Sequence, residues 1–172
     1  MKRMSILLLL LLMAGLGEAA LRKSSKRPFI ELGPKASLYI GSVGLGLGAE
    51  VLVNPLRNLG LRMDLAELYF GDRDGDGEGD TQFYFNLRGL SVDGILYIPV
   101  SGVRPYAFFG FGLAADGRTE LAFRGGLGLN YPVTPGTDLF FEPGVIISHN
   151  SARENTDVWF RFSMGGRFGI IR

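Results

Sequence analysis

The sequence of 172 residues contains no cysteine, a single histidine and a single tryptophan. Without cysteine, the chain has no disulfides, no thiolate nucleophile and no cysteine-ligated metal. Its formal net charge of +1 provides no strong positive field of the kind with which nucleic-acid-binding domains attract phosphates. The apolar run from Ile6 to Met13 is shorter than the about 20 residues that a transmembrane helix needs. No helical period follows it.

The N-terminus has the pattern of a secretory signal peptide. Lys2 and Arg3 precede the apolar run, and the small residues Gly17 and Ala19 follow it. Cleavage after Ala19 predicts a signal peptide of residues 1–19 and an exported domain of residues 20–172. Because no cysteine lies near this site, we expect no lipoprotein anchor.

The last stretch of the chain shows a pattern that most of the exported domain repeats. In residues 158–171 every second position is apolar or glycine, beginning with Val158 and ending with Ile170. The positions between them include Arg161 and Arg167. Successive side chains of a strand point to opposite faces, so this stretch predicts a strand with one apolar and one polar face.

Seven other stretches alternate in the same way, and most reach the about 9–11 residues with which a tilted strand crosses a membrane. The eight predicted strands are residues 28–41, 45–53, 59–70, 81–99, 103–114, 119–133, 138–149 and 158–171. The alternation in 81–99 slips by one near Gly89, which predicts a β-bulge. The connections at 54–58, 99–102 and 132–137 are short and contain proline, whereas 71–80 and 149–156 are longer and polar. This asymmetry is typical of outer-membrane barrels.

The polar faces of these strands carry equal numbers of acidic and basic residues. The acids are Glu31, Glu50, Asp64, Asp93, Glu120, Asp138 and Glu142, and the bases are Lys35, Arg62, Arg88, Arg104, Arg124, Arg161 and Arg167. An isolated buried ion costs several kcal/mol, and an eight-stranded barrel is just wide enough to be filled by side chains. We therefore predict a filled, ion-paired interior. The alternatives are a charge-lined channel and a soluble periplasmic barrel whose apolar face points inward to bind an apolar ligand.

The chain resembles the small OmpA/OmpX-type family of outer-membrane barrels. Three hairpin cores carry the resemblance: GLGLGAEVLVNPLRNLGLRMDL, RPYAFFGFGLA and FRGGLGLNYPVTPGTDLFFEPGV. The resemblance implies an all-β fold, an eight-stranded antiparallel up-and-down transmembrane β-barrel in the outer membrane of a Gram-negative cell. It implies a monomer with a structural or surface-interaction role, without catalysis or a cofactor. The implied partners are outer-membrane lipid, lipopolysaccharide and the barrel assembly machinery.

The only histidine offers an alternative function. His149 and Ser151, at the end of the seventh predicted strand, resemble the His-x-Ser of the outer-membrane lipid A deacylase barrels. This resemblance implies an esterase in which His149 activates a lipid-facing Ser151, and Glu154 is the nearby acid of the same parity. The other interpretation is a histidine at the level of the lipid headgroups with no catalytic role.

The acidic stretch GDRDGDGEGD at residues 71–80 is the one candidate metal site. Asp72, Asp74 and Asp76 match the first half of a calcium loop. The twelfth position, where the motif requires a bidentate glutamate, is Phe83. The sequence therefore favours a solvated acidic loop, with weak binding of a divalent cation, bridging to lipopolysaccharide phosphates, as the alternative.

Overall fold

The computed structural model describes residues 27–40, 44–71, 80–85, 89–100, 102–115, 119–150 and 155–171. The predicted signal peptide lies outside them. The strands are β1 (Ile30–Ile40), β2 (Gly44–Leu56), β3 (Leu59–Gly71), β4 (Asp80–Phe85), β5 (Gly89–Tyr97), β6 (Arg104–Ala115), β7 (Thr119–Thr134), β8 (Thr137–Asn150) and β9 (Asn155–Ile171). Within the described residues, no helix is long and apolar enough to span a membrane.

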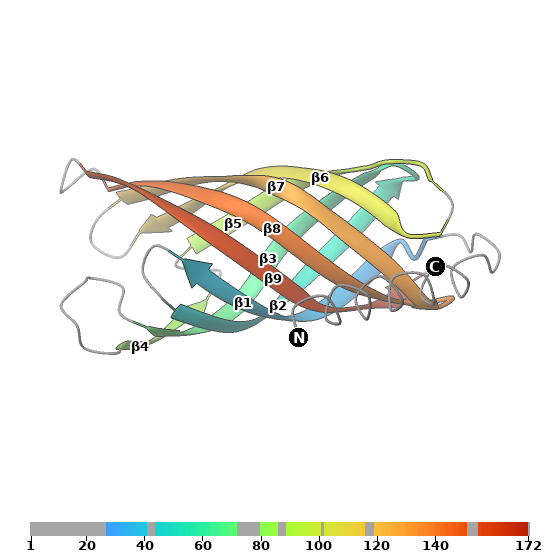
Figure 1. The fold of residues 1–172 in the computed structure, drawn as a ribbon, viewed down its shortest axis with the longest axis horizontal. Helices are drawn as coiled ribbons and strands as arrows, with labels where there is room; N and C mark the ends of the chain where they lie inside the picture. Colours follow the sequence, from blue (N-terminus) through green and yellow to red (C-terminus); the bar gives the residue numbers. More distant parts are fainter. Residues whose placement is uncertain are drawn as a thin grey trace, which may run out of the picture.

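The strands form one closed antiparallel sheet. Each strand from β5 to β9 pairs with the next, β9 pairs back with β1, and β1, β2 and β3 follow in order. Strand β3 closes the ring, because its first half pairs with β5 and its second half pairs with β4. Strands β4 and β5 therefore share one position in the wall, and the fold is the predicted eight-stranded barrel (Figure 1).

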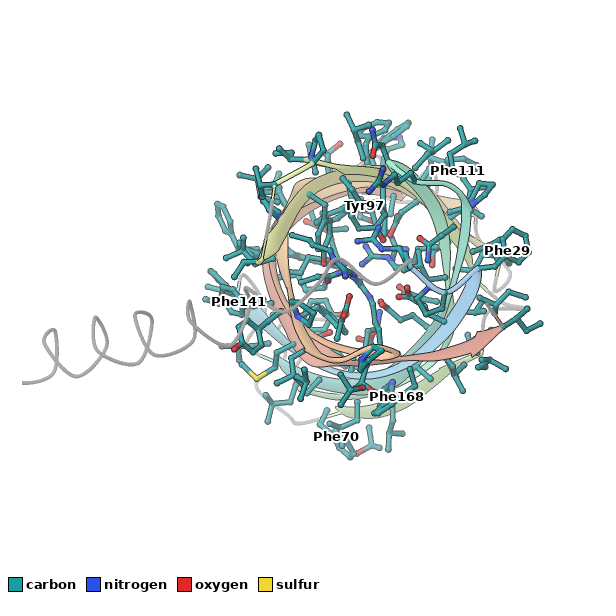
Figure 2. All side chains as sticks on the ribbon, turned by 90° about the vertical axis from the view of Figure 1, so that its right-hand side faces the viewer. Phe29, Phe70, Tyr97, Phe111, Phe141 and Phe168 are labelled. Carbon is teal, nitrogen blue, oxygen red and sulfur yellow. The ribbon has the colours of Figure 1, made fainter. Side chains whose placement is uncertain are left out.

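The two faces of the wall differ as the alternation predicts. Figure 2, a view along the barrel, shows Phe111, Phe141 and Phe168 pointing away from the ring and Tyr97 pointing into it. The outward-facing residues include Leu32, Leu38, Leu47, Leu61, Met63, Leu96, Phe109, Phe123, Leu127, Leu129, Leu139, Phe160, Phe162 and Ile170. The buried inward-facing charges are Glu31, Lys35, Glu50, Arg62, Asp93, Arg124, Asp138, Glu142, Arg161 and Arg167.

Glycine makes room for the large inward side chains. Tyr106 of β6 pairs with Gly128 of β7, and a Cβ atom on Gly128 would overlap the Tyr106 ring. A Cβ atom on Gly44 of β2 would likewise overlap the Tyr69 ring of β3, although the register partner of Tyr69 is Gly46. Because a barrel this narrow has little free volume, a large residue on one strand requires a glycine beside it.

Strand β3 departs from the predicted alternation. Ala49 of β2 pairs with Ala66, but the next residue of β2, Glu50, pairs with Asp64. Leu65 is therefore the extra residue of a bulge, and the faces exchange beyond it. Uninterrupted alternation predicts that Ala66 lies on the inner face. This prediction is wrong, because Ala66 pairs with Ala49 and lies on the outer face.

The predicted strand 81–99 is two strands in the structure. Phe85 of β4 pairs with Ala66 of β3, whereas Val92 of β5 pairs with Met63. The seven residue steps from Phe85 to Val92 thus correspond to only three steps on β3, from Ala66 to Met63. A one-residue bulge accounts for one extra step, not for four. The inward position of Asp93 and the outward position of Leu96 are nevertheless as predicted. The prediction for Phe83 lies outside the described side chains.

Two connections are tighter than the sequence predicts. The turn between β2 and β3 consists of Arg57 and Asn58 alone, and the turn between β7 and β8 consists of Pro135 and Gly136. The prolines at 55 and 132 therefore lie within strands. We call this end, at the right of Figure 1, the short-turn end; β1 begins and β9 ends there. The opposite end is the loop end, whose connections lie outside the described residues.

Candidate functional site

A network of ion pairs fills the middle of the barrel, and Arg62 of β3 is its hub. Its Nε lies 2.7 Å from Oδ2 of Asp93, and its Nη1 lies 3.5 Å from Oε2 of Glu50. The same Nη1 donates a hydrogen bond to Glu142. Three acids from β2, β5 and β8 thus share one guanidinium, and all four side chains are at most 1% exposed.

Each of these three acids also binds another arginine. Arg124 Nη2 donates to Oδ2 of Asp93 at 2.9 Å. Arg167 Nε donates to Oε1 of Glu50 at 2.7 Å, and Arg161 Nη2 donates to Oε1 of Glu142 at 3.2 Å. Because every acid of the hub has a second cation, the charges neutralise one another as buried ions must.

Towards the loop end, the network continues through Asp64. Its Oδ2 accepts from Arg124 Nη1 at 2.6 Å, and its Oδ1 lies 2.7 Å from Lys35 Nζ. The Lys35 ammonium also lies 3.5 Å from Oε2 of Glu67, which accepts a hydrogen bond from Tyr39. Glu67 is an interior acid that the sequence analysis missed, because the bulge at Leu65 turns it inward.

Towards the short-turn end, the network becomes sparser. Arg104 Nη1 donates to Oδ2 of Asp138 at 3.1 Å, and Glu31 accepts from Asn54 Nδ2 at 3.0 Å. A cavity of about 10 Å³ lies beside these groups, lined in part by Glu31, Arg104 and Asp138. A volume of this size holds about one water molecule. The predicted inward positions of Glu120 and Arg88 lie outside the described side chains.

An apolar cluster shares the interior with the charges. It consists of Leu52, Ile95, Tyr97, Tyr106 and Phe108. Even alternation from Arg104 along β6 places Tyr106 on the inner face. Tyr106 connects the cluster to the network, since its hydroxyl donates to Oε2 of Glu142 at 2.8 Å. Among the described residues, no group of three or more carboxylate or histidine side chains is arranged to hold a metal ion.

His149 lies on the outer face near the loop end. It pairs with Thr156 across β8 and β9, and its Nδ1 lies 3.1 Å from the Thr156 hydroxyl oxygen. This places His149 on the side that the sequence predicts. Ser151 and Glu154 of the esterase hypothesis lie outside the described residues, as do Asp72, Asp74 and Asp76 of the predicted acidic loop.

The fold can be compared with solved structures. The crystal structure of Neisserial surface protein A matches with a TM-score of 0.57 and 13% identity, over 82% of this chain and 96% of that one. The N-terminal β-barrel domain of Pseudomonas aeruginosa OprF matches with a TM-score of 0.51 and 15% identity, over 83% and 98% of the two chains. The chain has the fold of the small outer-membrane β-barrels.

A designed transmembrane β-barrel is similar as well, with a TM-score of 0.52 and 17% identity over 86% of this chain and 100% of that one. A scan against protein-family models and a search of curated proteins gave no match. The matches to solved structures confirm the predicted resemblance to the OmpA/OmpX-type barrels for the fold.

Proposed function

We propose that this protein is an outer-membrane barrel with a structural or surface-interaction role, and that it neither conducts ions nor catalyses a reaction. Its ion-paired interior gives stability, and its loop end faces lipopolysaccharide or partners outside the cell. The short-turn end then faces the periplasm, since short periplasmic turns are the rule in such barrels.

The outer surface supports a membrane location. Leucine, isoleucine and phenylalanine side chains are exposed around the whole wall; Phe109 is 68% exposed and Phe160 52%. Monomeric soluble proteins rarely expose apolar patches larger than a few hundred Å², because water disfavours them. A soluble barrel with an apolar ligand site has the reverse arrangement, with its charges outside. Lipid is the environment that matches this surface.

The observation that carries the non-conducting role is the shared hub at Arg62. The three acids of the hub also accept hydrogen bonds from Arg124, Arg161 and Arg167, at 2.7–3.2 Å. A water-filled pore needs charged side chains that line an open path, whereas these side chains block the path by binding across it.

The test combines location with conductance. Cells that express the protein are fractionated, and the detergent-solubilised membrane protein is run on a gel with and without boiling. We expect a heat-modifiable band in the outer-membrane fraction and no channel steps when the purified barrel is added to planar lipid bilayers. A soluble protein without the band would contradict the membrane location, and regular conductance steps would contradict the filled interior.

A lipid A esterase is the second candidate, and the outward position of His149 at the loop end favours it. A base there faces the outer leaflet, where the acyl esters of lipid A lie. The test is mass spectrometry of lipid A from cells expressing the wild type or the Ser151→Ala variant. Loss of an acyl chain with the wild type alone would support the esterase, and identical lipid A would remove it.

A further inference from the structure

The three residues before β1 lie at the short-turn end of the barrel. The Phe29 amide donates to the Ile171 carbonyl at 2.7 Å, and the Phe29 carbonyl accepts from the Asn54 amide at 2.8 Å. The Pro28 carbonyl accepts from Asn54 Nδ2 at 2.9 Å. This segment is therefore fixed to β2 and β9 by three hydrogen bonds, and it directs Arg27 towards the barrel axis.

Arg27 reaches the opposite wall. Its guanidinium carbon lies 3.2 Å from the centre of the Tyr97 ring, and Tyr97 belongs to β5, which is separated from β1 by β2 and β3. A guanidinium stacked on an aromatic face is a cation–π contact, which is strongest where water is excluded. Tyr97 is 4% exposed and meets that condition. Figure 2, viewed from this end, shows Tyr97 inside the ring.

Among the described residues, one acid at this mouth has no arginine paired with it. Arg104 is paired with Asp138, and Arg167 is paired with Glu50. Glu31 remains; it is 2% exposed, and its Oε2 has no hydrogen-bond partner among the described residues. Arg27 Nη1 is likewise buried without a partner. An aromatic face and a buried carboxylate with an unused oxygen together form a site for a guanidinium or an ammonium group.

The contact between Arg27 and this site is opposed by the loss of hydration. Burial lowers the pKa of Arg27 below its usual value, and Tyr97 and Glu31 counteract this shift. The loss of hydration thus opposes the contacts that hold the side chain. A cation–π contact of ordinary strength is small enough to open at ambient temperature.

We propose that the short-turn mouth is a binding site for one organic cation, a guanidinium or a primary ammonium, and that Arg27 occupies it as an intramolecular ligand. Residues 27–29 then form a strap that holds the mouth shut. A free cation of the same class competes with Arg27 for the Tyr97 face, and the unused oxygen of Glu31 is available to accept a hydrogen bond from it. The strap controls access only to the space beside Glu31 and the apolar cluster, since the hub at Arg62 closes the barrel beyond it.

The experiment uses a cysteine reporter, for which the chain is suited because it contains no cysteine. Leu52→Cys introduces a thiol at a position that is 1% exposed and packs in the same cluster as Tyr97. Its rate of reaction with an anionic methanethiosulfonate is measured on the folded barrel in detergent. We expect Arg27→Ala to raise this rate about tenfold, as the loss of a buried cation–π contact predicts.

Chemical rescue then tests the chemistry of the site. Millimolar guanidinium chloride should return the labelling rate of the Arg27→Ala barrel towards that of the parent, and sodium chloride at the same ionic strength should not. Equal rates with and without Arg27 would overturn the strap. Faster labelling that guanidinium does not reverse would overturn the cation site, because Arg27 would then act by bulk alone.

Two controls separate the strap from general loosening. Arg57→Ala removes an arginine from the exposed turn at the same end and should leave the rate unchanged. A Ser163→Cys reporter, at a buried position further from this end along β9, should stay unreactive with and without Arg27.

Heat-modifiability on a gel confirms that each variant is folded. If Arg27→Ala does not fold, Arg27→Gln keeps a polar, though shorter, side chain and removes the charge.

Discussion

Arg62 and Asp93 are direct cross-strand partners of β3 and β5, and both side chains are closed off from solvent. The arginine Nε lies 2.7 Å from the carboxylate Oδ2. The arginine also binds Glu50 and Glu142, so one guanidinium compensates three acids that come from three other strands. Removal of this side chain therefore exposes each acid to the repulsion of the others.

Arg62→Leu should lower the free energy of unfolding by roughly 3–5 kcal/mol, the usual effect of removing one partner from a buried ion pair. The measurement is urea unfolding of the barrel in lipid vesicles. Arg57→Leu, in the exposed turn, is the matched control and should change the free energy of unfolding by less than about 0.5 kcal/mol. The double variant Arg62→Leu/Asp93→Leu should lose less than the sum of the two single variants. A loss no larger than that of the control would show that the hub does not hold the barrel together.

Gly128→Ala should destabilise the barrel by about 1–3 kcal/mol, because its Cβ would overlap the Tyr106 ring and force it from its contact with Glu142. Gly94→Ala is the control on the outer face, where the nearest atom to a new Cβ is 3.8 Å away. Alanine there should be neutral or slightly stabilising. Thermal unfolding of both variants in the same detergent gives the comparison, and equal midpoints would contradict the close packing of Tyr106 against β7.

Phe109→Arg tests which face meets lipid. Phe109 lies near the middle of β6 and is 68% exposed. An arginine on the lipid face near the bilayer midplane costs about 2–4 kcal/mol, whereas Phe109→Leu keeps the surface apolar. Urea unfolding in vesicles should show that the free energy of unfolding falls by this amount in Phe109→Arg and not in Phe109→Leu. An arginine variant as stable as the leucine variant would mean that water, not lipid, surrounds the wall.

Calcium should leave the thermal stability of the barrel unchanged at millimolar concentration. The acidic loop lacks the bidentate glutamate of a complete calcium site, since Phe83 stands at that position. The measurement is the unfolding temperature with calcium and with a chelator, for the wild type and for Asp72→Asn/Asp74→Asn/Asp76→Asn. A calcium-dependent rise in the wild type that the triple variant lacks would establish the metal site instead.

The sequence predicts the barrel well because its two environments differ so strongly. Alternation places Phe160 on the outer face and Arg161 in the interior, and the structure confirms both. It also predicts that the inner charges pair. It does not predict which residues pair, because Arg62 and Glu142 are 80 positions apart and meet only through the closure and register of the whole sheet.

The missed interior residues have physical causes. Glu67 turns inward because of the bulge, and the sequence carries a trace of it: the apolar residues Leu65 and Leu68 are an odd number of positions apart. Phe108 shares the parity of Tyr106, but Phe109 beside it is aromatic too, so the pair itself has no polar member to mark the inner face. The inner face of an eight-stranded barrel also has room for apolar side chains where charges are not required, as at Ile95.

The hydrogen bonds of Phe29 also determine when the short-turn mouth forms. Its amide bonds the end of β9 and its carbonyl bonds β2, so the two bonds exist together only when β1 lies between β9 and β2 in the closed sheet. Arg27 can then reach Tyr97 only after the ring has closed. Arg27 therefore covers the Tyr97 face only in the closed ring, and the accessibility of this face distinguishes a finished barrel from one whose seam is still open.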